Sequence, residues 1–327
     1  GGRYMVVTKS PLNNMIASSN SGGVWGARLK YAGYDALIVE GKSSKPVYIS
    51  IDDDKVEIKD ASNLWGKTSE HVEEHLKEIH GQEASVLNIG PAGENLSLMA
   101  AIINEADRAA GRSGVGAVMG SKHLKAIVCK SKRTVIEPNN KEALRESVTH
   151  CLKLIKENGV TGTGLPTYGT AVLVNIINNI GSFPTKNWQE SEFANSEMIS
   201  GETLKEKHIV KQGFCHRCPI GCGRVINLNG KIVGGPEYEP LWAYGANCGV
   251  DNLEAINEAN YWANEMGVDA ISCPTTIATA MELYQKGYIK EEDCDGIPLE
   301  FGSAKAIVEW TKRIGLGHNK LAKLMAQ

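Results

Sequence analysis

The sequence predicts an α+β protein in which a sheet-rich domain, residues 1–136, precedes a mainly α-helical domain, residues 137–327. Three observations predict this fold class. The length of 327 residues suits two domains of roughly 100–200 residues each. Short apolar runs between Gly-rich turns dominate up to about residue 136, as in strands. From Asn139 onward the apolar residues recur with the helical period.

The first domain contains three short apolar runs that predict strands, at residues 5–8, 36–39 and 126–128. Segments 47–51 and 56–58 alternate in character across the Asp-rich turn 52–54, which predicts a hairpin. One helix is expected between the second and third runs. It begins with Ser69 as the capping residue, ends near His80, and places Val72, Leu76 and Ile79 on one face.

The second domain shows helical periodicity in five stretches, at residues 139–159, 171–180, 252–266, 274–286 and 303–314. Gly159 is a plausible C-terminal stop for the first of them. Between these helices, the Gly- and Cys-rich stretch 212–251 is predicted to be irregular backbone of the kind that carries function.

Charge and hydropathy exclude several classes of protein. A net charge of −3 leaves no basic surplus with which to neutralise nucleic acid or an anionic membrane, so neither partner is expected. No run of about 18 apolar residues is present, which predicts a cytoplasmic protein. The chain begins without Met and runs directly into a strand-like segment, so we expect an interior piece of a longer protein whose N-terminal part is missing.

Three cysteines within eight positions are the most informative feature: Cys215, Cys218 and Cys222 have C-x2-C-x3-C spacing. Such spacing brings thiolates together on a tight loop, which suits an iron-sulfur cluster, although zinc and an unliganded group of core cysteines remain alternatives. A 4Fe-4S cluster takes four thiolates, so a fourth cysteine must lie elsewhere. The other five cysteines are expected to be small buried apolar residues: Cys129, Cys151, Cys248, Cys273 and Cys294.

Two segments pair glycines with arginine, namely 1–3 together with 19–23, and 108–116. Glycines let backbone N–H groups approach an anion, and an arginine adds a fork-shaped donor suited to phosphate. The spacing fits neither the dinucleotide-binding fingerprint nor the Walker A loop. Glycine turns with solvated arginines remain the alternative to a phosphate site.

These and further motifs follow one another in the order found in one family: 2–4, 7–12, 20–23, 32–35, 90–95, 108–112, 114–120, 168–170, 215–222, 235–239 and 280–284. The chain resembles the tungsten-containing aldehyde ferredoxin oxidoreductases over essentially its whole length. The resemblance implies an N-terminal domain of two β-sheets related by pseudo-twofold symmetry, followed by two mainly helical domains. The chain would then be a fragment of a three-domain protein that holds most of the first domain and the second.

The resemblance also implies the cofactors and their ligands. Members bind tungsten through two molybdopterins, with molybdenum as the alternative metal for this chain, and a nearby 4Fe-4S cluster passes electrons to ferredoxin. Cys215, Cys218 and Cys222 would hold the cluster, with its fourth cysteine beyond Gln327. Backbone carbonyls of Asn20 and Ala109 would hold a magnesium ion between the pterin phosphates. The pterin-binding residues would be Arg3, Asn20, Gly22, Arg108, Ala109, Gly111, Arg112, Asn264 and Asp269.

Two positions depart from the family pattern. Asn264 stands where a carboxylate is usual, so its pterin contact would lack that charge. Residues 258–261 depart from the Glu-x-x-His motif that bridges subunits through an iron, so that dimer metal is not expected, although a homo-oligomer remains possible.

The implied activity is the oxidation of a small aldehyde to a carboxylate, with ferredoxin or a partner redox subunit as electron acceptor. Glu239 matches a pocket glutamate of the family and is the candidate acid/base, whereas Glu237 is expected to be a solvated carboxylate. Two alternatives remain: a related reductase of aromatic thioesters or carboxylic acids, and a non-enzymatic iron-sulfur or zinc module.

Overall fold

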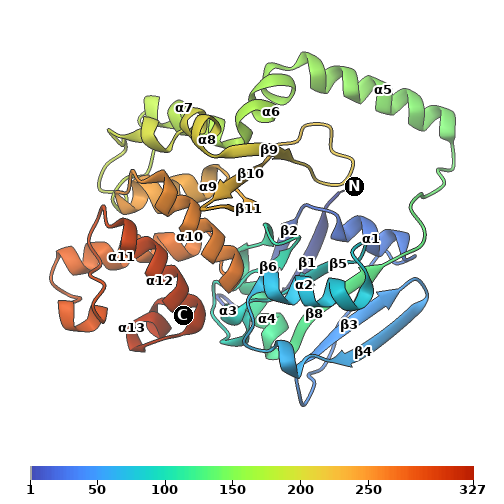
Figure 1. Cartoon of the computed structure of the whole chain (residues 1–327), viewed down its shortest axis with the longest axis horizontal. Coiled ribbons are helices and arrows are strands. Elements are labelled where there is room, and N and C mark those ends of the chain that lie inside the picture. The colour runs from blue at the N-terminus through green and yellow to red at the C-terminus, as the bar shows by residue number, and fades with distance from the viewer. Residues whose placement is uncertain (1) are drawn as a thin grey trace.

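A computed structural model describes residues 2–327, and it has the expected α+β architecture (Figure 1). The sheet domain contains a two-stranded ribbon, β1 (Tyr4–Lys9) and β2 (Ile16–Ser21), and a six-stranded mixed sheet in the order β4-β3-β8-β5-β6-β7. Its strands are β3 (Val47–Asp52), β4 (Lys55–Asp60), β5 (Ser85–Asn88), β6 (Ile102–Asn104), β7 (Arg108–Ala110) and β8 (Leu124–Lys130). A symmetry relation between the two sheets stays a prediction.

Helices cover both faces of the six-stranded sheet because its central strands alternate apolar side chains to the two sides. From β8, Ala126 and Val128 join the core beneath α2 (Ser69–His80). The neighbouring residues Ile127 and Cys129 join the opposite core, which also receives side chains of α1 (Trp25–Tyr31) and α4 (Val115–Ser121). A short helix, α3 (Pro91–Glu94), follows β5.

Most predicted elements of the first domain are confirmed. Segments 5–8 and 126–128 are strands, and the expected hairpin is β3–β4, in which Asp52 pairs with Lys55. The strand predicted at 36–39 is wrong. The segment does alternate, since Leu37 and Val39 pack against the core and Ile38 is exposed, but none of the described strands pairs with it.

Two details of the helix α2 also differ from the prediction. Thr68 rather than Ser69 precedes the helix, and the Ser69 hydroxyl instead donates to Asn88 Oδ1 at 2.8 Å. Ile79 is exposed, whereas Glu73 is buried beside Val72 and Leu76. The Glu73 carboxylate takes this place because it accepts a hydrogen bond from the Ala106 amide (2.8 Å) and pairs with Lys77.

The second domain is mainly helical. Its helices are α5 (Lys141–Glu157), α6 (Leu165–Tyr168), α7 (Leu173–Asn179), α8 (Gly201–Lys207), α9 (Tyr238–Pro240), α10 (Leu253–Met266), α11 (Ser272–Gln285), α12 (Ala304–Leu316) and α13 (Lys320–Met325). The paired helices α10 and α12 supply much of one large core, whose largest fully buried side chains include Trp310 and Tyr244. In contrast, α5 buries none of its residues and extends away from the rest of the chain (Figure 1).

The stretch 212–251 is more regular than predicted. It completes a three-stranded sheet of β9 (Ile209–Gly213), β10 (Gly223–Leu228) and β11 (Lys231–Gly234). Asn229 and Gly230, both with positive φ, form the two-residue turn between β10 and β11. Asn-Gly is the strongest short-range sequence signal of a hairpin, but here it lies within a Gly- and Cys-rich stretch that is typical of irregular backbone.

The two domains meet along backbone hydrogen bonds. Ala101 N donates to Gly267 O at 2.8 Å, and Asp269 N donates to Met99 O at 2.9 Å. Gly90 lies so close to Met266 that a Cβ at this position would be 2.4 Å from the Met266 carbonyl. Within residues 2–327, no helix combines the length and the apolar character needed to cross a bilayer.

Candidate functional site

The first glycine-arginine loop lies where β1 begins and β2 ends. Arg3 Nε donates to Asn20 Oδ1 at 2.6 Å, and Arg3 Nη2 lies 3.4 Å from the Asn20 carbonyl. Gly22 is buried, and a Cβ there would be 2.6 Å from Cys215 Sγ. Only glycine therefore allows this loop and the cysteine loop of the second domain to approach each other so closely.

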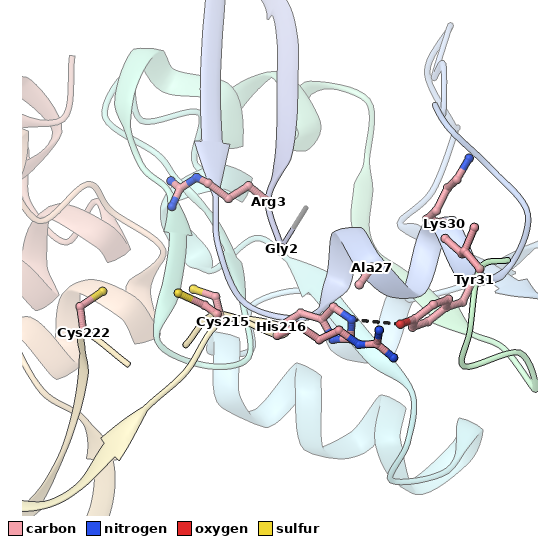
Figure 2. Close-up of a pocket in the computed structure, with 11 residues that line it drawn as sticks. Gly2, Arg3, Ala27, Lys30, Tyr31, Cys215, His216 and Cys222 are labelled. Atoms are coloured by element: carbon pink, nitrogen blue, oxygen red, sulfur yellow. Dashed lines mark hydrogen bonds between the residues drawn. The ribbon is translucent and has the colours of Figure 1, made fainter. Parts of the chain in front are cut away.

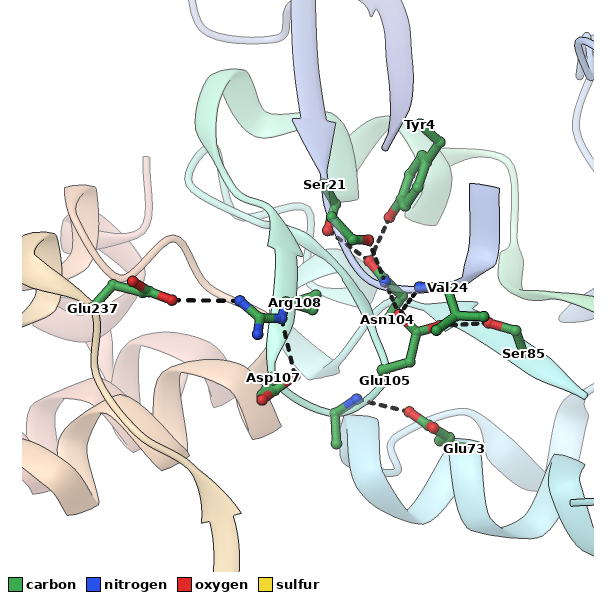
Figure 3. A network of polar contacts seen from close by, with 12 residues as sticks. Tyr4, Ser21, Val24, Glu73, Ser85, Asn104, Glu105, Asp107, Arg108 and Glu237 are labelled. Atoms are coloured by element: carbon green, nitrogen blue, oxygen red, sulfur yellow. Dashed lines mark hydrogen bonds and ion pairs between the residues drawn. The ribbon is translucent and has the colours of Figure 1, made fainter. Parts of the chain in front are cut away.

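The second loop contributes Arg108, the first residue of β7, whose guanidinium reaches across to the second domain (Figure 3). It lies 3.6 Å from Asp107 and 3.4 Å from Glu237. Glu237 also accepts a hydrogen bond from the Thr170 hydroxyl. Glu237 is therefore not the freely solvated carboxylate that the sequence predicts, because it joins the two domains through Arg108.

Charge and burial shift the pKa values around Arg108. Burial opposes the guanidinium charge, but the carboxylates of Asp107 and Glu237 outweigh it and raise the pKa of Arg108. Burial raises the pKa of Asp107 to about 6, against the opposing effect of Arg108. Burial also raises the pKa of the Cys222 thiol, and the Glu237 carboxylate adds to this shift. The positive charge of Arg108 thus interacts with Asp107, Glu237 and the Cys222 thiol at the domain boundary.

A third contact brings Asp269 against the end of the same loop. Asp269 is buried, and its Oδ1 would be 2.8 Å from a Cβ at Gly111. Its Oδ2 accepts from the Ser272 amide at 3.0 Å and lies 3.8 Å from Arg112 Nε. Asn264, in the last turn of α10, is half-buried. Ala109 is exposed, and its strand β7 lies against β2, which carries Asn20.

The three clustered cysteines are half-buried in a loop that faces the first domain (Figure 2). The Cys218 amide donates to the Cys215 carbonyl at 3.0 Å, and Arg217 between them has a φ of 52°. His216 fixes the loop to the sheet domain, since its amide donates to Gly23 O (2.9 Å) and its Nε2 lies 3.0 Å from the Tyr31 hydroxyl. The scattered cysteines are buried as predicted, except Cys151, which is exposed on α5.

A cavity of about 590 Å³ opens beside these cysteines. The described residues that line it include three cations and no carboxylate: the cations are Arg3, Lys30 and Arg217. Three thiols at one wall and guanidinium groups near them are a donor set that suits a soft metal and an anionic ligand. Among residues 2–327, however, no three His, Cys, Asp or Glu side chains are already grouped closely enough to hold a metal ion.

Glu239 lies in α9 and is exposed. Its Oε2 accepts a hydrogen bond of 2.6 Å from Trp242 Nε1, and Trp242 is buried. The carboxylate is therefore held at one oxygen by a neutral donor. Burial raises the pKa of the adjacent Tyr238 to about 12, and Glu239 contributes to this shift.

Sequence reasoning missed three residues of this junction. Glu237 and Thr170 lie within matched motifs, but their link to Arg108 depends on how the two domains approach each other. Tyr31 carries no local signal, because its contact with His216 joins residues 185 positions apart in the sequence.

The fold and this junction define a two-domain α+β protein whose candidate site lies between the domains and combines thiols with guanidinium groups. The chain belongs to the aldehyde ferredoxin oxidoreductase family. The family description "Aldehyde ferredoxin oxidoreductase, N-terminal domain" matches residues 1–131, and "Aldehyde ferredoxin oxidoreductase, domains 2 & 3" matches residues 146–327.

Known proteins agree with this assignment. The chain is 50% identical over 321 residues to a tungsten-containing aldehyde ferredoxin oxidoreductase of Pyrococcus horikoshii, covering 96% of this chain and 52% of the relative. It is 49% identical to the protein of the same name from Pyrococcus furiosus, covering 99% and 54%. The chain thus spans about half the length of the curated relatives it matches.

A solved structure has the same fold. It is the active-site complex BamBC of benzoyl coenzyme A reductase in complex with 1,5-dienoyl-CoA, with a TM-score of 0.84 and 30% sequence identity. The alignment covers 99% of this chain and 51% of that chain.

Proposed function

We propose that this chain carries the pterin-binding and cluster-binding part of a tungsten-dependent oxidoreductase, which oxidises aldehydes to carboxylic acids and passes the electrons to ferredoxin or a partner redox subunit. The observation that carries the proposal is the convergence of the predicted segments at one junction. Gly22 meets Cys215, Arg108 meets Glu237, and Gly111 meets Asp269. These segments come from both domains and were predicted independently of the structure.

The residues of the junction fit the proposed groups. Arg3 and Arg112 expose guanidinium groups, which are suited to pterin phosphates. Asp269 Oδ1, beside Gly111, is a carboxylate acceptor for pterin N–H groups, and Asn264 offers an amide nearby in the sequence. The carbonyls of Asn20 and Ala109 are oxygen donors of the type that magnesium takes. Cys215, Cys218 and Cys222 supply three thiolates for a 4Fe-4S cluster.

Tungsten bound through two molybdopterins, or molybdenum in its place, supplies the two-electron chemistry, and the cluster supplies single-electron transfer. A residue of the chain itself would transfer a proton. Aldehyde and water give the carboxylic acid with release of two protons and two electrons. Glu239, with one oxygen held by Trp242 Nε1, is positioned to accept a proton at the other oxygen as a general base.

Metal and pterin analysis of anaerobically purified full-length protein tests the proposal. We expect tungsten or molybdenum, iron and sulfide in constant ratio, a fluorescent pterin after acid treatment, and aldehyde-dependent reduction of a viologen dye. Absence of both tungsten and molybdenum would reject the proposal. Zinc or iron without pterin would instead support a non-enzymatic metal module. A cytoplasmic location stays a prediction.

A second candidate is a reductase of aromatic thioesters or carboxylic acids. The likeness to the benzoyl coenzyme A reductase complex at a TM-score of 0.84 favours it, but its 30% identity is lower than the 50% identity to an aldehyde oxidoreductase. Assays of aldehyde oxidation and thioester reduction with the same dye separate the two candidates.

A further inference from the structure

A short loop in the second domain holds three consecutive residues in the left-handed backbone region. Lys186, Asn187 and Trp188 have φ values of 47°, 52° and 67°. None is glycine, so each of them pays a steric penalty that other parts of the structure must offset. Such strain concentrates where a protein must hold a side chain in one position for a ligand.

The loop is firmly held. The amides of Lys186 and Asn187 donate to the carbonyls of Ala246 and Asn247, both at 2.9 Å. The Asn187 side chain donates to Glu282 Oε2 on α11 at 2.6 Å. A bridge between Thr185 and Glu190 closes the base of the loop. The strained residues Lys186 and Asn187 are therefore themselves bonded to two other segments, residues 246–247 and α11.

The side chain that this loop presents is a tryptophan. Trp188 is 66% exposed, and its ring lies edge-on to that of Trp242, with centroids 6.2 Å apart and planes at 65°. Trp242 in turn donates to Glu239 at 2.6 Å. Trp188, Trp242 and Glu239 thus form a continuous row that ends at the proposed general base.

We propose that Trp188 is a specificity-determining residue that forms an aromatic wall of the substrate site and favours aldehydes carrying an aromatic ring over short aliphatic ones. The inference rests on the proposed aldehyde oxidation. An indole with an exposed face attracts a second aromatic ring in an offset or edge-on arrangement, whereas a two-carbon aldehyde is too small to cover it. Trp188 contacts the ring of Trp242, and only Trp242 of the two makes a hydrogen bond to Glu239, so replacing Trp188 should change substrate binding rather than proton transfer.

The test compares Trp188→Ala, Trp188→Phe and the unaltered full-length enzyme, with benzaldehyde and acetaldehyde as substrates. Trp188→Ala should raise the KM for benzaldehyde by about 10-fold and leave kcat and the KM for acetaldehyde within about 2-fold. Trp188→Phe keeps an aromatic ring, so its KM for benzaldehyde should stay close to that of the unaltered enzyme. Tyr288→Ala is the matched control, since Tyr288 is an aromatic residue that is 76% exposed and has no ring contact with Trp242 among the described residues, and it should change neither KM.

A binding measurement separates this inference from the proposed function. Benzoate should quench the tryptophan fluorescence of the unaltered protein, and Trp188→Ala should weaken that binding by a similar factor. Equal losses for both aldehydes, or no loss for either, would overturn the aromatic wall. If the unaltered enzyme binds benzoate through Trp188 but oxidises no aldehyde, the proposed function is rejected, whereas the aromatic wall formed by Trp188 is retained.

Discussion

The two sides of the domain junction differ in how far the protein's own contacts determine them. On the sheet side, Asn104 is fully buried and its side chain is satisfied: Oδ1 accepts from Tyr4 (2.9 Å) and Ser21 (2.7 Å), and Nδ2 donates to Gly22 O at 3.1 Å (Figure 3). On the other side, the cysteine loop is half-exposed and is fixed to the first domain mainly through His216.

This difference indicates which side needs a ligand. A buried polar network with every partner present stabilises its own geometry. In the cysteine loop, Arg224 holds the backbone carbonyls of Gly221 and Cys222, but the three thiols themselves would gain a fixed arrangement when the proposed metal binds them, because metal binding and local folding are coupled. The sheet side is thus preformed, whereas the cysteine side would be completed by the proposed cluster.

We expect the largest effect on the cysteine side of the junction from the loss of one clustered cysteine. Cys218→Ala removes one of three local thiolates, so we expect iron and sulfide to fall to background and dye reduction to be lost. Cys151→Ala is the matched control, because Cys151 is exposed on α5 and should keep full iron content. Equal iron contents in the two variants would contradict a cluster at this loop.

Glu239→Gln tests whether Glu239, in the second domain, accepts the proton in aldehyde oxidation. The amide keeps the size and the acceptor for Trp242 Nε1 but cannot take a proton. We expect kcat/KM for aldehydes to fall by about 100- to 10,000-fold, with tungsten and iron contents unchanged. Glu292→Gln, at an exposed glutamate distant in sequence from α9, is the control. An unchanged rate would remove Glu239 from the mechanism.

The same contrast separates what the sequence can predict from what it cannot. Local patterns predict α2 and the β3–β4 hairpin because their signals lie within a few residues. The strand expected at 36–39 fails because a strand also needs a neighbour, which local alternation does not supply.

The candidate site divides in the same way. The cysteine spacing and the glycine-arginine loops are readable from the sequence as segments. The link from Arg108 to Glu237 is not, because it depends on the packing of the domains, and two carboxylates two positions apart look alike in a sequence. The structure shows that Glu237 bonds Thr170 and Arg108 at the junction, whereas Glu239 is exposed and bonds only Trp242 among the described residues.

A buried ion pair tests whether the sheet side is stable by itself. Lys125 on β8 is fully buried and bonds Glu94, whose other oxygen accepts from the Gly66 amide. Lys125→Met leaves a buried carboxylate without its cation and should lower the free energy of unfolding by about 3–5 kcal/mol. Lys125→Met with Glu94→Leu should recover most of it, as measured by denaturant unfolding. A double variant no better than the single one would show that the network, rather than the charge, matters.

Removal of the proposed cluster should make only the cysteine side of the junction more mobile. Arg217 is exposed in the cysteine loop, so trypsin should cleave after it about 10-fold faster in cluster-free protein than in loaded protein. Cleavage within residues 85–130 should stay unchanged. Arg217→Gln removes the fragment and identifies the cut. Equal acceleration in both regions would mean that the cluster stabilises the whole chain.

Two tyrosine-histidine pairs allow the smallest and sharpest comparison. Tyr31 and His216 join the cysteine loop to α1, with a 3.0 Å contact and centroids 5.6 Å apart. Tyr48 and His80 have nearly the same geometry inside the sheet domain, at 3.1 Å and 5.7 Å. Each Tyr→Phe change removes one hydrogen bond, worth about 0.5–1.5 kcal/mol.

Only Tyr31→Phe should affect the cysteine loop. A loss of that size corresponds to about a 2- to 10-fold rise in the open population of the loop, and hence in the rate of trypsin cleavage after Arg217. Tyr48→Phe should lower global stability by a similar amount and leave that cleavage rate unchanged, because its hydrogen bond lies within the preformed side. If both variants accelerate cleavage equally, the two sides of the junction open together, and the distinction between a preformed side and a metal-completed side fails.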